Sequence, residues 1–392
     1  MQPGGYSGYD KGLSVLEQYD LTSENTHRGR GALLCQTQQG LKMIRPYNGP
    51  AGRLEKVYEL LEHLKEAGHK NIDQILRNKE GNLISTDKDG ISYIVKDWWD
   101  LRECDARSGN DVIKAVRELA SIHKDMYMNI VSELPYKEDC MSKNQHTFQC
   151  NQDKNQEKTL MKFMETNYGD EQSDIQEKNV SCEEYFIQKN CQENQAPDLR
   201  EIYRKHNQEL KKIREFIRKR KQKNQFEYLY LEHVPRYLVY GEEVLRRLEK
   251  CAYEKMRYED FQKGSVCHNG CTQHNFLMGK SGAILVNYEH YCFDSHMADL
   301  AQFMRKILEK HGWNRSLAEK IIHAYDQMRS LSQEELEQLQ IRLSYPEKFW
   351  KISNNYYNNN KAFFPERTVE KLIHQMENER NWLEFIQHFQ YN

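Results

Sequence analysis

The pattern of the chain changes near residue 100, and this change constrains the fold more than any other feature. Before it, two short runs with strand character, 32–36 and 41–45, flank a tight turn, and a hairpin pattern turns at Asp89-Gly90. Between these pairs lies one segment with apolar residues at helical spacing. Strand, strand, helix, strand, strand predicts a compact α+β lobe, which we place at residues 1–99.

In the remainder, residues 100–392, the periodicity is mainly helical, so we expect a second, helical lobe. A short hairpin that turns at Ser281-Gly282 interrupts it. From 134 to 197, Lys, Glu, Asn and Gln crowd together with few apolar anchors, and we interpret this stretch as a flexible insertion. The basic helical pattern that follows, at 200–225, is typical of a solvated helix face.

Composition excludes several classes of protein. A net charge of −2 gives no global field that would draw the chain to nucleic acid or to an anionic membrane. No apolar run approaches the ~20 residues that span a bilayer, and the first residues lack the pattern of a secretory signal. We therefore expect the ten Cys residues to be mostly reduced, in a protein made in the cytosol.

The stretch "VCHNGCTQHNFL", residues 266–277, concentrates coordinating side chains. One interpretation takes Cys267, His268, Cys271 and His274 as zinc ligands, since tetrahedral zinc accepts these types. However, adjacent Cys and His seldom point at one centre, and structural zinc sites usually come as two separated pairs. A nucleophilic Cys271 with a His as base lacks an identifiable orienting group.

A third interpretation uses the residues that come next. His268, then Asn275, then a strand and "ILVNYEHYCFD" repeat the layout of a phosphotransfer loop. In protein kinases an Asp of this loop accepts the substrate proton, an Asn further on coordinates magnesium, and an Asp on the next hairpin holds the metal ions.

The chain resembles the aminoglycoside phosphotransferase and choline kinase branch of the kinase-like fold, and within it the CotS-type spore coat proteins. The likeness extends over nearly the whole chain outside the polar insertion. It is carried by "THRGRGALL", "LLEHLKEAGHKNID", "ELASIH", "YCFDSHMADLAQFMRKI" and "LSYPEKFWKISNNYYNNNKAFFPERTVEKL". The resemblance implies a two-lobed, protein-kinase-like fold with a small α/β N-lobe and a mainly helical C-lobe.

The resemblance also assigns roles to residues of the N-lobe. The family's strand Lys, which touches phosphates in a kinase, falls on Lys42. Its helix Glu partner falls on Glu59, with Glu55 and Glu62 left open because spacing alone does not separate one helical turn from the next. Residues 93–98 would form the linker between the lobes, where an adenine would stack.

In the C-lobe, His268 matches the loop His, Asn275 the metal-binding Asn, and Asp299 the Asp that braces the loop from the next helix. We expect His268, like His123 in "LASIH", to be a satisfied interior histidine.

Two departures from the family pattern decide the expected function. Gly270 stands at the position of the catalytic Asp and has no side chain to accept a proton. Asn287 stands at the position of the metal-binding Asp, and a neutral amide binds Mg²⁺ weakly because this hard cation favours carboxylates. Glu289 keeps one carboxylate in the metal segment.

We therefore expect a catalytically degenerate protein that acts as a structural or assembly component of the bacterial spore coat. The resemblance implies a path from the mother-cell cytoplasm to the coat and other coat proteins as partners; 24 Tyr residues suit extensive protein contacts. No cofactor and no metal are expected. The alternative is a residual small-molecule or protein kinase that uses ATP and Mg²⁺ with Lys42 and either Glu289 or a displaced Asp294.

Overall fold

A computed structural model describes residues 12–29, 31–128, 194–358 and 365–389. The predicted insertion at 134–197 lies almost wholly outside the described residues. Within the described part, no helix is long and apolar enough to cross a membrane.

The N-lobe is an antiparallel sheet with the strand order β1-β2-β3-β5-β4. A short 3-10 helix, Leu13–Gln18, precedes the strands β1 (Ser23–Gly29), β2 (Ala32–Thr37), β3 (Gly40–Pro46), β4 (Ser85–Thr86) and β5 (Ser92–Asp97). The two predicted strands before the helix are confirmed as β2 and β3, and the turn at Asp89-Gly90 is confirmed between β4 and β5. The predicted linker at 93–98 is wrong, because most of it is strand β5 and pairs with β3.

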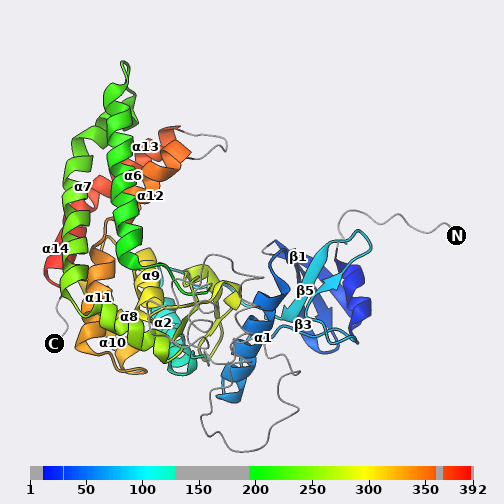
Figure 1. Ribbon diagram of the computed structural model, residues 1–392. Coiled ribbons are helices and arrows are strands. Elements are labelled where there is room, and N and C mark those ends of the chain that lie inside the picture. The colour runs from blue at the N-terminus through cyan, green and yellow to red at the C-terminus, as the bar shows by residue number, and fades with distance from the viewer. Residues whose placement is uncertain (1–11, 30, 129–193, 359–364, 390–392) are drawn as a thin grey trace, which may run out of the picture. The chain divides into compact units, whose positions relative to one another are not determined.

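Helix α1 (Ala51–Glu66) lies beside this sheet (Figure 1). It buries Leu54, Val57, Leu60, Leu61 and Leu64, which recur at helical spacing. Gly68, with φ of 105°, follows the helix in the left-handed conformation that ends many helices.

Each face of the sheet carries its own apolar cluster, because side chains alternate across a strand. One cluster joins the 3-10 helix to Leu33, Cys35 and Ile44 of the sheet. The other joins Leu34 and Met43 to residues of the β7–β8 hairpin in the C-lobe. Whether a side chain of β2 or β3 faces the C-lobe therefore depends on its place in this alternation.

The C-lobe is mainly helical, as predicted. One group of its helices comprises α2 (Gly109–Asp125), α8 (Tyr253–Gln262), α9 (Met297–Leu308), α10 (Arg315–Asp326), α11 (Gln333–Ser344) and α14 (Glu379–Gln387). Between α8 and α9 lie the short strands β6 (Val266–Cys267), β7 (Phe276–Met278), β8 (Ala283–Leu285) and β9 (Cys292–Phe293), in two antiparallel pairs, β6 with β9 and β7 with β8.

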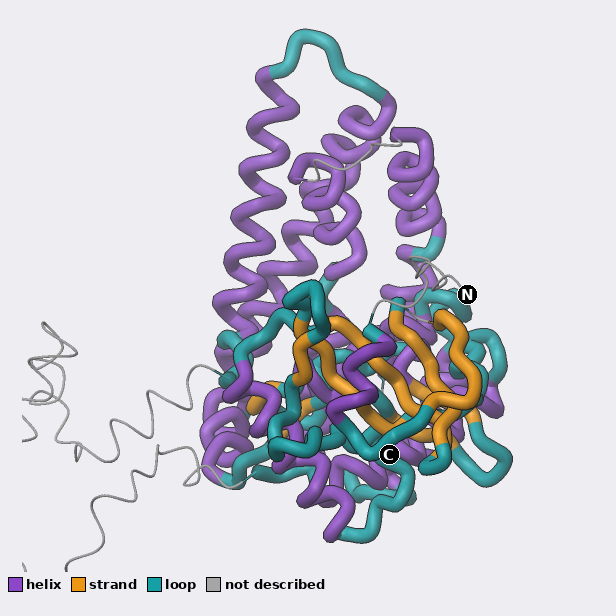
Figure 2. The backbone as a smooth tube through the Cα atoms, turned by 90° about the vertical axis from the view of Figure 1, so that its right-hand side faces the viewer, coloured by secondary structure: helices purple, strands orange, loops and turns teal. Residues whose placement is uncertain are grey.

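Two long helices, α6 (Leu199–Lys219) and α7 (Gln225–Lys250), run side by side and are joined by a short loop (Figures 1 and 2). Helices α12 (Glu347–Asn358) and α13 (Pro365–Glu377) pack against this pair. Asn224 starts α7 with a capping box, in which its side-chain oxygen accepts the Glu227 backbone N–H and the Glu227 carboxylate accepts the Asn224 backbone N–H. The predicted basic helix is thus confirmed as α6, with Leu210, Ile213 and Ile217 in a shared core.

Candidate functional site

The loop after β6 is held by one carboxylate on α9. Asp299 accepts the backbone N–H of His268 at 2.6 Å and that of Asn269 at 2.9 Å. Asn269 has φ of 56°, in the left-handed region that Asn tolerates better than most residues. The predicted role of Asp299 as the brace of the loop is confirmed.

His268 and His123 are buried beside this brace, as expected, although Nδ1 of His268 has no hydrogen-bond partner among the described residues. His268 donates from Nε2 to the backbone oxygen of Val286 at 2.9 Å. His123 contacts the Tyr325 hydroxyl at 2.7 Å and stacks on His296 with 4.3 Å between ring centroids. Burial lowers the pKa of both His123 and His296, so this stack is neutral at neutral pH. These rings fix the shape of the loop.

The structure does not bring the four zinc-ligand candidates together. Cys267 donates to the backbone oxygen of Ser295 at 3.0 Å, and Cys271 is fully buried. His274 is exposed and its Nδ1 forms a hydrogen bond with the Glu103 carboxylate. In the part of the chain that the structure describes, no three His, Cys, Asp or Glu side chains form a group that could hold a metal ion.

Gly270 lies in a tight space as well as lacking a side chain. Its backbone oxygen accepts the side-chain N–H of Asn275 at 2.8 Å. A Cβ added at Gly270 would lie 3.1 Å from two atoms of the His268 ring and 3.3 Å from the Asn275 amide nitrogen. A carboxylate at this position would therefore require the histidine or the amide to shift.

Asn275 and Asn287 stand at the two positions that hold metal ions in the kinases that this chain resembles. Here their side chains form a hydrogen bond with each other. Asn287 donates from Nδ2 to the side-chain oxygen of Asn275 at 2.9 Å. Asn287 also has φ of 72°, and its backbone N–H is bound by Asp73 at 2.8 Å. The predicted site residues Asn275, Asn287 and Glu289 do lie in one region, next to the loop.

The centre of this region is a lysine that the sequence did not single out. Lys96 of β5 is buried, and its ammonium group donates to Asp73 at 2.7 Å, to Asn287 at 2.8 Å and to Glu289 at 2.8 Å. These three oxygens satisfy its three N–H donors. Arg45 adds a second cation, with Nη1 3.6 Å from the Glu289 carboxylate.

The charges in this cluster compensate one another. Burial acts to lower the pKa of Lys96, but the negative charges of Asp73 and Glu289 outweigh it, and the pKa is raised. For Glu289, burial acts to raise the pKa, yet Lys96 and Arg45 together lower it to about 2. Burial raises the pKa of Asp73 in spite of Lys96. Lys96 is therefore a fixed internal cation, and Glu289 is its ionised partner.

Lys42, the predicted phosphate-contacting lysine, does not lie with these residues. Its ammonium group bonds to Asp97, the residue directly opposite it on β5. Successive side chains of a strand point to opposite faces, so Lys42 and Asp97 lie on the face away from Met43, Arg45 and Lys96. By strand parity, Arg45 is the β3 cation that faces the C-lobe.

Glu59, the predicted helix partner, is exposed on α1. The two alternatives also pair elsewhere, Glu55 with Arg77 at 2.7 Å and Glu62 with Lys65 at 3.6 Å. Helix α1 reaches the metal segment through Arg53 instead, which donates to the backbone oxygens of Glu289 at 3.0 Å and Tyr291 at 2.8 Å.

Sequence reasoning missed Lys96, Asp73 and Arg45, although Lys96 and Asp73 each left a signal. Lys96 is the one cation in the strand "SYIVKD", and Asp73 follows a buried isoleucine in "NIDQI". A charged residue inside an apolar run is rarely buried without a partner. Each of these two residues therefore indicated a partner of opposite charge elsewhere in the chain.

The fold and the braced loop define a protein of the kinase-like class, and solved structures agree. An aminoglycoside phosphotransferase from Alicyclobacillus acidocaldarius subsp. acidocaldarius DSM 446 has a TM-score of 0.73 at 14% identity, over 99% of this chain and 96% of that one. A spectinomycin phosphotransferase, solved with ADP and spectinomycin, has a TM-score of 0.57 at 12% identity, over 98% of this chain and 99% of that one. Identities this low establish the fold alone.

The family follows from a match over residues 184–389, more than half of the chain. The chain belongs to the family described as "Spore coat putative kinase YutH". It is also 26% identical to spore coat protein S of Bacillus subtilis (strain 168) over 133 residues, which are 34% of this chain and 38% of that protein. The predicted fold and the predicted spore coat family are confirmed.

Proposed function

We propose that the chain is a catalytically degenerate kinase-like protein that serves as a structural or assembly component of the spore coat. The observation that carries the proposal is the placement of the Lys96 ammonium between Asp73, Asn287 and Glu289. This is the segment in which the resembling kinases hold their metal ions.

The buried ammonium competes with a divalent cation for the same oxygens. Mg²⁺ favours carboxylate ligands, and both carboxylates of the cluster are bonded to Lys96. A metal ion would have to displace the ammonium and would still face the guanidinium of Arg45. Without the metal, phosphotransfer loses an interaction that is often the largest in catalysis.

Among the described residues, the carboxylate considered for the role of the missing base at Gly270 is Asp294. General-base assistance typically contributes about 10²–10⁴-fold to rate. Asp294, the displaced candidate, lies 3.4 Å from Arg342 of α11, and its backbone oxygen accepts the Ser265 hydroxyl. Its carboxylate is therefore engaged elsewhere in the C-lobe.

A cluster of buried apolar side chains from both lobes lies where we would expect an adenine to insert. The members of this cluster are buried and belong to β2, β3 and the residue after β5 on one side, and to the β7–β8 hairpin and the residue after it on the other: Ala32, Leu34, Met43, Trp98, Leu277, Ile284 and Val286. A nucleotide would have to part these contacts, so we infer no bound ATP and no cofactor in the working protein.

A structural role agrees with the family and with the relative found in a spore coat. In this proposal the protein is made in the mother-cell cytoplasm, and its fold is retained to bind other coat proteins. Coat assembly then depends on the folded chain and not on the residues of the former metal site.

Sporulating cells of the source organism test the role. We expect deletion of the gene to alter the coat, while cells that carry Asn275→Ala assemble a normal coat with normal amounts of the protein. Circular dichroism of the purified variant confirms that it folds. A coat defect as severe as that of the deletion, from a folded Asn275→Ala protein, would show that chemistry at the site is required and would contradict the proposal.

A further inference from the structure

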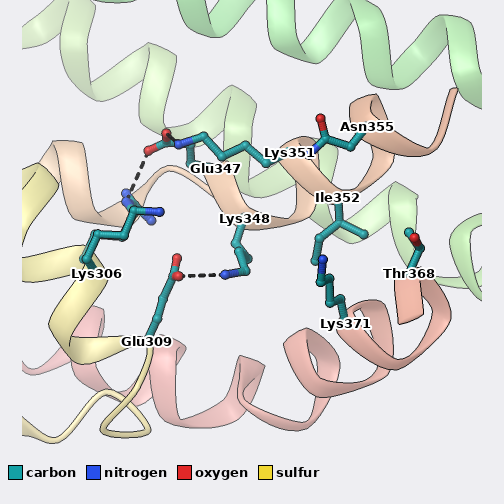
Figure 3. Close-up of a pocket in the computed structure, with 10 residues that line it drawn as sticks. Lys306, Glu309, Glu347, Lys348, Lys351, Ile352, Asn355, Thr368 and Lys371 are labelled. Carbon is teal, nitrogen blue, oxygen red and sulfur yellow. Dashed lines mark hydrogen bonds and ion pairs between the residues drawn. The ribbon is translucent and has the colours of Figure 1, made fainter. Parts of the chain in front are cut away.

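A hollow of about 220 Å³ lies between α9, α12 and α13, far along the chain from the loop. Five cations line it: Arg305, Lys306, Lys348, Lys351 and Lys371 (Figure 3). The carboxylates that line it are Glu309 and Glu347. The lining thus carries three positive charges in excess, in a chain whose net charge is −2.

Both carboxylates are already engaged with part of this set. Lys348 lies 2.9 Å from Glu309, while Glu347 is shared by Arg305 at 3.3 Å and Lys351. Among the described residues no carboxylate forms an ion pair with Lys306, which Figure 3 shows reaching toward the hollow. Burial and the like charge of Lys351 lower the pKa of Lys306, so an anion placed there would relieve a real repulsion.

The positive lining continues beyond this hollow. A second hollow, of about 770 Å³, shares Lys306, Glu309 and Lys348 with the first. It adds the cations Arg107 and Lys310 and one carboxylate, Asp105, so its lining also carries positive charge in excess. It reaches Gln273 in the loop after β6. Two adjoining hollows with the same excess sign are more than a solvated helix face, because their cations come from separate elements that converge on a shared space.

We propose that these hollows bind a small multivalent oxyanion, such as a diphosphate or a tricarboxylate, with Lys306 and Lys371 as its main contacts. The volume of the first hollow corresponds to several water molecules at ~30 Å³ each, which suits a compact anion. Lysine ammonium groups bind phosphate and carboxylate oxygens as point charges. The same groups would also take acidic side chains of a partner protein.

Titration calorimetry of the full chain at low ionic strength tests the site and its source, with inorganic pyrophosphate in one arm and a hexaglutamate peptide in the other. We expect pyrophosphate to bind, and Lys306→Gln and Lys371→Gln each to weaken binding by about tenfold. Lys320→Gln, exposed on α10, is the matched control and leaves the affinity unchanged.

Each outcome either supports or overturns the proposed anion site. Binding of the peptide in place of pyrophosphate, with the same sensitivity to Lys306 and Lys371, supports the site and identifies the source as an acidic segment of a partner. No binding in either arm overturns the proposal. An equal loss in Lys320→Gln also overturns it, because the affinity would then come from diffuse surface charge. None of these results depends on whether the kinase site is active.

Discussion

The ammonium nitrogen of Lys96 lies 2.8 Å from the side-chain oxygen of Asn287, although 191 residues separate the two in the chain. Lys96 belongs to the N-lobe sheet, and Asn287 stands in the C-lobe at the position where the family has a metal-binding Asp. One contact therefore ties the two lobes at the position where the resemblance places a metal ion.

Replacing Lys96 by Met leaves the buried Asp73 and Glu289 without their cation. Breaking a buried ion pair from one side typically costs about 3–5 kcal/mol, and we expect a loss of this size in the free energy of unfolding, measured with urea. Lys42→Met is the matched control from the same sheet. Its partner Asp97 is partly exposed, so its loss is expected near 1 kcal/mol. Equal losses in the two variants would show that the buried Lys96 contributes no more to stability than Lys42 does.

The lowered pKa of Glu289 predicts how the stability of the protein depends on pH. Its pKa is lowered from 4.5 to about 2 in the folded chain, so its ionised form stabilises the fold above pH 4.5. This contribution is lost as the pH falls from 4.5 toward 2.

Urea unfolding at several pH values in this window measures the slope. We expect the stability of the wild-type protein to fall more steeply with decreasing pH than that of Glu289→Gln. Parallel slopes in the two proteins would mean that Glu289 is not the paired carboxylate described here.

Metal binding should return only when the internal cation is removed. Asn287→Asp alone adds a carboxylate but leaves the Lys96 ammonium in place, so we expect no stabilisation by Mg²⁺ in thermal unfolding. Asn287→Asp combined with Lys96→Met leaves several carboxylates facing one space, and here we expect a Mg²⁺-dependent rise in Tm. A comparable rise in the single variant would refute the competition between the ammonium and the metal.

Gly270 should be sensitive to the smallest added side chain. Gly270→Ala places a methyl group against His268 and Asn275, both of which are held by hydrogen bonds, so we expect a loss of about 1–3 kcal/mol in the free energy of unfolding. Gly282→Ala, in the β7–β8 turn, meets no atom within 4 Å and is the matched control, with little or no loss. If Gly270→Ala were as stable as the control, the loop would have room for a catalytic residue.

Local sequence patterns predicted the helices and strands. Which residues meet at the site could be learned only from the packing of the two lobes. Helices such as α1 and α6 bury one stripe, and their apolar spacing shows it in the sequence alone. The loop could be recognised because His268, Asn275 and Asp299 keep the spacing of a known motif. These predictions needed no knowledge of which residues meet across the lobes.

The observed position of Lys42 differs from the expected one for a geometric reason. Lys42 and Arg45 are three residues apart on β3, so they point to opposite faces, and only the packing of the sheet decides which face meets the C-lobe. Lys96 was missed because its partners Asp73 and Asn287 come from two other parts of the chain. Their meeting depends on the register of β3 with β5 and on the docking of the lobes.

The most direct test of the account is a phosphotransfer assay of the purified wild-type protein with ATP, Mg²⁺ and a panel of hydroxyl acceptors. We predict no transfer above that of the unfolded protein, because Gly270 offers no side chain as a base and Lys96 is bonded to the oxygens that a metal ion would need. Mg²⁺-dependent turnover at the 1–100 per second or so that is typical of kinases, abolished by Asn275→Ala, would contradict it.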